Sequence, residues 1–262
     1  MKKAISLIMS IALCMCLCAC GKNEAVKSAE DAISAIGEVS ADSGEAIANA
    51  EKYYGILTDA EREKVENRLA LVEAREQFDK VIGEIVYTNA KEAYEKLKEV
   101  ADLCISGMDD IYNAWYFGIY KAEDALPSRF YDYYAYMAQE VPSFSADELK
   151  AAAESLGYSE AMVKKDWQKS LWIVESAIAK RGDYDTIAAN MNEAEKVLQA
   201  LTEEYNDYIY YPKLKDYYAA VKSYVEFYTS PSGSFKQLSD TINNYENEIR
   251  TLESDVSFLF NK

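Results

Sequence analysis

The sequence contains no histidine, and proline and glycine are scarce, with 4 and 10 residues in a chain of 262. Without histidine, the chain lacks the side chain most often used for acid–base catalysis near neutral pH and the commonest imidazole metal ligand. A turn-rich β fold normally contains more proline and glycine than this. These absences exclude histidine-dependent chemistry, argue against a β fold and favour helices.

Positive charge is also scarce, because 28 basic residues face 45 acidic ones and the formal net charge is −17. Such a chain is repelled by phosphate backbones, so nucleic acid is excluded as a partner. No EF-hand loop, Walker A sequence or nucleophile-elbow pattern is present, and we predict neither a cofactor nor a metal. With this many carboxylates, the acid pairs that a glycoside hydrolase needs arise by chance. We therefore predict that the protein is not an enzyme, with a wall-active hydrolase left as an alternative.

Cysteine is confined almost entirely to the N-terminus, where four of the five lie within the first twenty residues. Met1-Lys2-Lys3 is a short cationic start, and an apolar run over 4–19 follows it. That run is too short to cross a bilayer as a helix, and the pattern is that of a secretory signal. The apolar spacers between the cysteines argue against a metal cluster.

The residues Leu17-Cys18-Ala19-Cys20 at the end of this run resemble the lipobox of bacterial lipoproteins, Leu-x-(Ala/Gly)-Cys. The resemblance implies that residues 1–19 are a signal peptide and that residues 20–23 form a tether with acyl chains such as palmitate on Cys20. Two or more acyl chains give a durable membrane anchor, whereas one does not. The expected location is extracytoplasmic, on the outer face of the plasma membrane, with Cys104 left without a disulfide partner.

Residues 24–82 are predicted to form a small module of three helices. Asp42 with Glu45, and Thr58 with Glu61, have the spacing of capping boxes and predict helices that begin near 43 and 59, after a first helix over 24–37. The segment resembles a spacer module that recurs in surface proteins and lipoproteins of Gram-positive gut bacteria, although Ser40-Ala41 departs from the usual Thr-Leu. The resemblance implies a stalk unit without chemistry. It rests on Ile33, Ile36-Gly37-Glu38-Val39, Ser43, Ile47, Ala50, Tyr53-Tyr54, Leu57-Thr58, Val65 and Asn67.

Residues 83–262 are predicted to form an elongated antiparallel helical bundle with heptad-type seams, which makes the whole chain all-α. A 3.5-residue repeat keeps one apolar seam facing a partner helix. Three such seams are present: Ala90, Tyr94, Leu97, Ala101, Cys104, Met108, Ile111, Trp115; Ile187, Met191, Ala194, Leu198, Leu201, Tyr205, Tyr208; and Phe235, Leu238, Ile242, Tyr245, Ile249, Leu252, Val256, Leu259. The first seam predicts a helix over 84–121.

Proline, glycine and capping residues predict where the other bundle helices begin and end. The pattern predicts a short helix over 127–141, a capped helix over 145–157, and one helix from Ser159 to Gly182. Pro212 either kinks or splits a long helix over 184–229. Ser234 with Gln237 is predicted to cap the last helix.

Tyrosine is abundant, with 22 residues of which all but Tyr53 and Tyr54 lie beyond residue 86. An exposed aromatic groove would suit sugar rings or peptide, because tyrosine combines an apolar face with a hydroxyl. Core packing is the favoured alternative, with the helix over 127–140 covering the Tyr112 stripe. Cys104 is predicted to be a buried thiol. The candidate ligand-binding residues are Tyr112, Trp115, Tyr116, Tyr120, Tyr133 and Tyr134.

These patterns together predict a non-enzymatic cell-surface lipoprotein that acts as a structural or interaction module. The alternative is a lipoprotein that holds sugar or peptide against its tyrosines. The membrane is the expected partner through Cys20. An extracellular protein, a glycan, or a second copy of the chain joined through the helical seams are the partners left open.

Overall fold

The structure is a computed structural model that describes residues 24–121, 132–164, 166–204 and 208–260. Within these ranges the regular elements are helices and no strand is present, which confirms the predicted all-α fold. The chain divides into two compact units, Met1–Val86 and Tyr87–Lys262. Both this division and the boundary expected between residues 82 and 83 lie inside one helix, α4 (Arg68–Tyr116). The units are described separately below.

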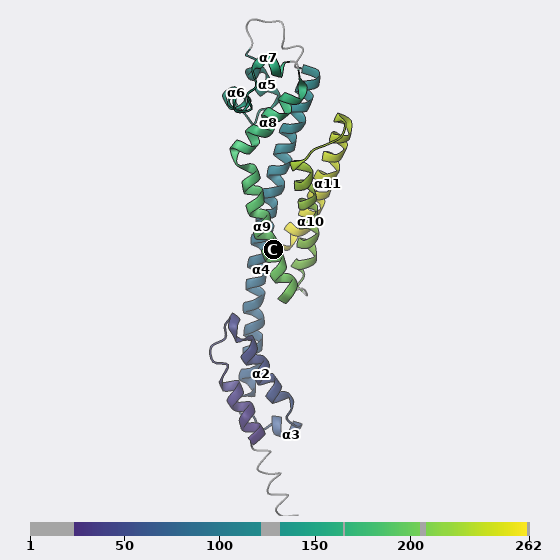
Figure 1. Ribbon diagram of the computed structural model, residues 1–262. Coiled ribbons are helices and arrows are strands. Elements are labelled where there is room, and N and C mark those ends of the chain that lie inside the picture. Colours follow the sequence, from purple (N-terminus) through teal and green to yellow (C-terminus); the bar gives the residue numbers. More distant parts are fainter. Residues whose placement is uncertain (1–23, 122–131, 165, 205–207, 261–262) are drawn as a thin grey trace, which may run out of the picture. The chain divides into compact units, whose positions relative to one another are not determined.

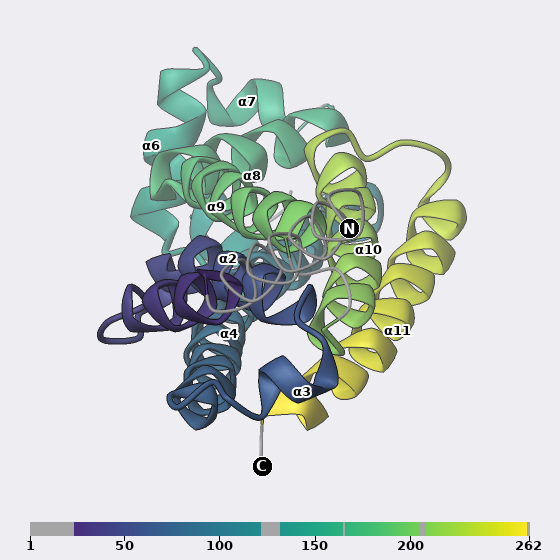
Figure 2. The same ribbon diagram turned by 90° about the horizontal axis from the view of Figure 1, so that it is seen from below.

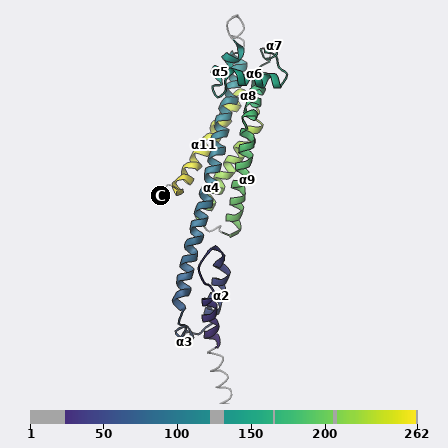
Figure 3. The same cartoon turned by 90° about the vertical axis from the view of Figure 1, so that its left-hand side faces the viewer.

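The first unit consists of a helix over 24–34, α2 (Gly44–Gly55), the short α3 (Asp59–Arg62) and the N-terminal part of α4 (Figure 3). The expected capping box of Thr58 and Glu61 is present. The one expected at Asp42 is not, because Ser40 and Ser43 cap a 3₁₀ turn, η1 (Ala41–Ser43), that precedes α2. The core of this unit is Ala29, Ile33, Ile36, Ile47, Ala50, Leu57, Val65, Leu71 and Ala74.

The helix expected from residue 59 onward is interrupted between α3 and α4. The Asn67 amide donates to the Glu30 carbonyl oxygen at 3.0 Å, and the Glu66 backbone N–H donates to the Glu30 carboxylate at 2.9 Å. Val65 is buried in the turn. Contacts with the helix over 24–34 therefore stabilise a turn that the local sequence does not encode.

In the second unit, the helix predicted to start at residue 84 is the continuation of α4, and Gly83 causes no break. The four long helices of the bundle alternate in direction, and α10 lies between α9 and α11 (Figure 2). Every residue of the first predicted seam is buried. Side chains of α4 contact α9 (Asp183–Glu204) at Asn190, α10 (Tyr210–Thr229) at Tyr217 and α11 (Phe235–Phe260) at Phe260.

Four shorter helices lie at the end of the bundle where α4 finishes (Figure 1). They are α5 (Tyr133–Glu140), α6 (Ala146–Ser155), α7 (Glu160–Val163) and α8 (Trp167–Arg181). The start expected at residue 127 lies outside the described residues, but α5 ends before Pro142 as predicted. The capping box of Ser145 with Glu148 is confirmed.

The predicted helix from Ser159 to Gly182 is two helices, because Asp166 accepts a hydrogen bond from the Gln168 backbone N–H and starts α8 anew. Gly182 ends α8 with a left-handed φ of 88°, as glycine at this position predicts. Residues 208–209 form a bend and turn, and Pro212 lies in the first turn of α10, where its missing N–H breaks no helical hydrogen bond. The predicted cap of α11 by Ser234 and Gln237 is confirmed.

α4 ends at Tyr116, earlier than predicted, and passes into one turn of π-helix, η2 (Phe117–Lys121). At this point the chain approaches α8 very closely. A Cβ built on Gly118 would lie 2.8 Å from the Trp167 carbonyl oxygen. Only glycine allows η2 and the start of α8 to meet at this distance.

We expect Gly118→Ala to lower the free energy of unfolding by about 1–3 kcal/mol, because either η2 or α8 has to shift to admit a methyl group. Gly83→Ala is the matched control. A Cβ at position 83 meets no atom within 4 Å, and alanine favours the middle of a helix by about 0.5–1 kcal/mol over glycine. Urea denaturation of both variants measures the difference. Equal effects of the two substitutions would contradict the close approach.

Candidate functional site

Cys20, the predicted lipidation site, lies outside the described residues. None of the described helices is long and apolar enough to cross a membrane. Among the described residues, no group of three or more cysteine, aspartate or glutamate side chains is placed to hold a metal ion.

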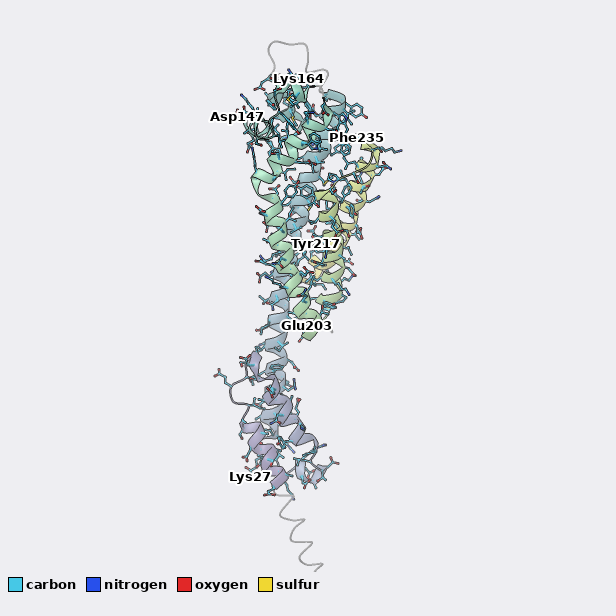
Figure 4. All side chains as sticks on the ribbon, viewed as in Figure 1. Lys27, Asp147, Lys164, Glu203, Tyr217 and Phe235 are labelled. Carbon is cyan, nitrogen blue, oxygen red and sulfur yellow. The ribbon has the colours of Figure 1, made fainter. Side chains whose placement is uncertain are left out.

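Three of the six aromatic candidates gather around one side chain of α11. The Phe235 ring lies 4.8 Å from the Tyr112 ring, centre to centre, and 6.2 and 5.8 Å from the rings of Tyr116 and Tyr120. Figure 4 shows Phe235 at the start of α11, near the end of α4. The expectation that the helix over 127–140 covers the Tyr112 stripe is therefore wrong. α11 covers it, and Tyr120 remains 55% exposed.

The other three candidates are buried, and two of them, Tyr133 and Tyr134, pack edge-on against each other at 5.6 Å. Trp115 stacks on Trp167 at 5.4 Å, with 15° between the ring planes. Tyr133 packs edge-on against Phe117 at 5.5 Å, and its hydroxyl shares a hydrogen bond with Ser170 at 3.1 Å. Tyr134 is 5% exposed. The six residues thus belong to separate packing contacts and do not share one open face.

Three tyrosines of α10 lie fully inside the bundle: Tyr217, Tyr224 and Tyr228. Figure 4 shows Tyr217 within the bundle. Burial raises the pKa of each of these phenols. The hydroxyls of Tyr217 and Tyr224 have no hydrogen-bond partner among the described residues. These hydroxyls therefore add no stabilising hydrogen bond to the aromatic core.

Cys104 is fully buried on the α4 seam, as predicted. Burial raises the pKa of its thiol to about 12, and the nearby Asp183 carboxylate contributes to the increase. A reactive cysteine needs exposure and a lowered pKa, so Cys104 serves as a small apolar side chain.

An ionic cluster of two buried carboxylates and a partly exposed arginine joins α4 to the α8–α9 corner. Arg181 lies 2.6 Å from the Asp183 carboxylate and 3.7 Å from that of Asp110, and its guanidinium lies 4.6 Å from the centre of the Phe144 ring. Asp110 and Asp183 are 2% and 4% exposed. Burial raises the pKa of Asp110, and the Arg181 charge opposes this. The sequence gives no signal for this cluster, because nothing local links Asp110 to Arg181 and Asp183, which lie about seventy residues further along the chain.

A groove of about 340 Å³ lies between α9 and α10. Its apolar lining comes from both helices, and its rim carries two carboxylates and one ammonium. The groove cannot be found from the sequence, because its residues are distributed over two helices whose relative register the sequence does not reveal. It is lined by Tyr184, Ile187, Ala188, Met191, Asn192, Glu195, Tyr218, Lys222, Val225, Glu226 and Thr229.

A second pocket, of about 270 Å³, lies between α4 and α11 and contains two carboxylates, Asp109 and Glu246. Partial removal from water in the pocket raises the pKa of both, although Asp109 itself is exposed, and the Asp109 charge raises the pKa of Glu246 further. Arg250 forms an ion pair with Glu246 at 3.3 Å and opposes the shift. A hydrolase would also use two carboxylates, but here the Arg250 guanidinium already neutralises one of them.

We expect Tyr224→Phe to leave the free energy of unfolding unchanged or to raise it, because the hydroxyl that is removed is buried and unpaired. Tyr133→Phe is the matched comparison, since it removes a hydroxyl that bonds to Ser170, and it should lower stability by about 1 kcal/mol. Thermal and urea denaturation of the two variants measures the change in the free energy of unfolding that each substitution causes. A larger loss for Tyr224→Phe would show that its hydroxyl has a partner.

We expect Asp109→Asn to raise the melting temperature at pH 7. A carboxyl whose folded-state pKa is raised disfavours folding once it is ionised, and this cost is absent below its ordinary pKa of 3.8. The gain should therefore shrink as the pH falls towards 3.5. Glu248→Gln, on the exposed face of α11, is the control. Melting curves at both pH values test this, and an undiminished gain at pH 3.5 would contradict it.

Comparison of the chain with models of protein families, with curated proteins and with solved structures finds no match.

Proposed function

We propose that this protein is a lipoprotein anchored to the outer face of the plasma membrane through Cys20, where it acts as a non-enzymatic structural or interaction module. One observation carries the proposal. A cationic start and a short apolar run lead directly to Leu17-Cys18-Ala19-Cys20. This arrangement suits export followed by acylation of the cysteine at the new N-terminus.

The bundle supports a structural or interaction role. The seam of α4 is covered by other helices of the bundle, the Cys104 thiol is buried, and the buried Asp110 and Asp183 carboxylates are neutralised by Arg181. The acid pair in the α4–α11 pocket is partly neutralised by Arg250. These features of the described residues support a role in binding or support rather than in catalysis.

An exposed aromatic surface on the short helices is a place where an extracellular protein or glycan could bind. Trp172 of α8 is 40% exposed and lies 6.2 Å from the Tyr158 ring, centre to centre. The Lys169 ammonium lies within 6 Å of the centres of both rings. Flat aromatic side chains that keep one face in solvent are common in protein interfaces.

We expect Cys20→Ala to abolish acylation and to release the protein from membranes when the full chain is expressed in a Gram-positive host. Cys18→Ala is the matched control, because it removes a neighbouring thiol of the same segment and leaves Leu17, Ala19 and Cys20 in place. Labelling with an alkynyl palmitate analogue, together with intact mass spectrometry, measures the modification.

The proposal fails if the wild-type protein keeps its initiator methionine and carries no acyl chain. It also fails if Cys18→Ala loses the label while Cys20→Ala keeps it, since the anchor would then be a different residue.

A further inference from the structure

The groove between α9 and α10 has the composition of a small ligand site. Its apolar surface is formed by Ile187, Ala188 and Met191 of α9 and by Val225 of α10. Two aromatic rings, Tyr184 and Tyr218, contribute to the wall. A volume of about 340 Å³ is at the lower end of the range for pockets that hold small organic molecules, and it suits a ligand with a single ring.

The polar groups on the rim indicate the charge of the ligand. Glu195 of α9 and Glu226 of α10 both line the groove. Lys222 lies on the same rim, and its ammonium lies 5.7 Å from the centre of the Tyr218 ring. A side-chain cation is thus already held at this wall of the groove. An ammonium ion over an aromatic face, with carboxylates near it, is a favourable arrangement.

The contact between Tyr218 and Lys222 alone would not identify a site. The same four-residue spacing places Lys215 over Tyr211, at 5.9 Å, and neither of these residues lines the groove. The α9–α10 position differs because the ring, the ammonium and two carboxylates adjoin a hollow apolar surface. The net charge of −17 also favours the approach of cations over anions.

We propose that the α9–α10 groove binds a small organic ammonium ion with an apolar body, and that Lys222 is its internal competitor. The body of the ligand lies against Met191 and Val225. Its ammonium takes the place of the Lys222 ammonium over Tyr218, beside the Glu195 carboxylate. This site lies far from Cys20 in the sequence, and the full chain, purified in detergent, is used to test it.

The test uses 2-phenylethylamine as the probe, with 2-phenylethanol and 3-phenylpropionate as the neutral and anionic analogues. Isothermal titration calorimetry should detect the amine and give at least tenfold weaker binding for the other two. Lys222→Met should tighten amine binding severalfold, because it removes the competing cation and keeps the apolar stem. Lys215→Met is the matched control and should leave the affinity unchanged.

Two further variants locate the site. Glu195→Gln should weaken amine binding at least fivefold, whereas Glu203→Gln, on the same helix but outside the groove, should not (Glu203 is labelled in Figure 4). Ala188→Trp should fill the groove and abolish binding while the protein remains folded.

Three results would overturn the proposal. The first is that the amine, the alcohol and the acid bind equally well, or that none of them binds. The second is that Lys222→Met and Lys215→Met have the same effect on the affinity for the amine. The third is that Ala188→Trp retains full affinity for the amine. None of these bears on acylation of Cys20, so failure here is distinguishable from failure of the proposed function.

Discussion

The second unit depends on one constraint, which is that the apolar seam of α4 must be buried. A helix with so many exposed apolar side chains is not stable alone in water, and each large side chain that leaves water contributes about 1.5–3 kcal/mol. Different helices cover different lengths of the seam. Tyr94 contacts Tyr217 of α10 and Phe260 of α11, whereas Trp115 stacks against Trp167 of α8. The long helices and the short ones are thus held by contacts with the same element.

The same constraint explains how far the sequence predicts the fold. The seam of α4, the caps at Thr58, Ser145 and Ser234, and the left-handed glycine at 182 are local patterns, and the structure contains them. The wrong boundaries have non-local causes. The turn before α4 depends on hydrogen bonds from Asn67 and Glu66 to Glu30, which belongs to another helix. The π-helical turn at the end of α4 coincides with a close approach to Trp167. In both cases the partner residue, Glu30 or Trp167, lies too far along the chain to be found by inspecting neighbouring residues.

The candidate sites were predicted less well for a related reason. The spacing of Tyr112, Tyr116 and Tyr120 shows that they share a helix face, but it does not reveal that Phe235 occupies the space between them. The α9–α10 groove requires the antiparallel register of two helices, which places Glu195 near Tyr218. The periodicity of apolar residues shows which face of each helix is buried, but it does not show which helix packs against that face.

Basic side chains are scarce in this chain, so the contacts that each of them makes are informative. Carboxylates greatly outnumber basic side chains, and several lysines along the bundle form ion pairs, as Lys98 does with Glu253 and Lys213 with Asp255. Lys222 instead lies over an aromatic ring beside an apolar groove whose rim holds two carboxylates. An ammonium over a ring gives up less solvation than one that is fully buried, and it can be displaced at modest cost. The bundle therefore combines a closed core that fixes its shape with an open groove in which, on our proposal, the Lys222 ammonium can be exchanged for that of a ligand.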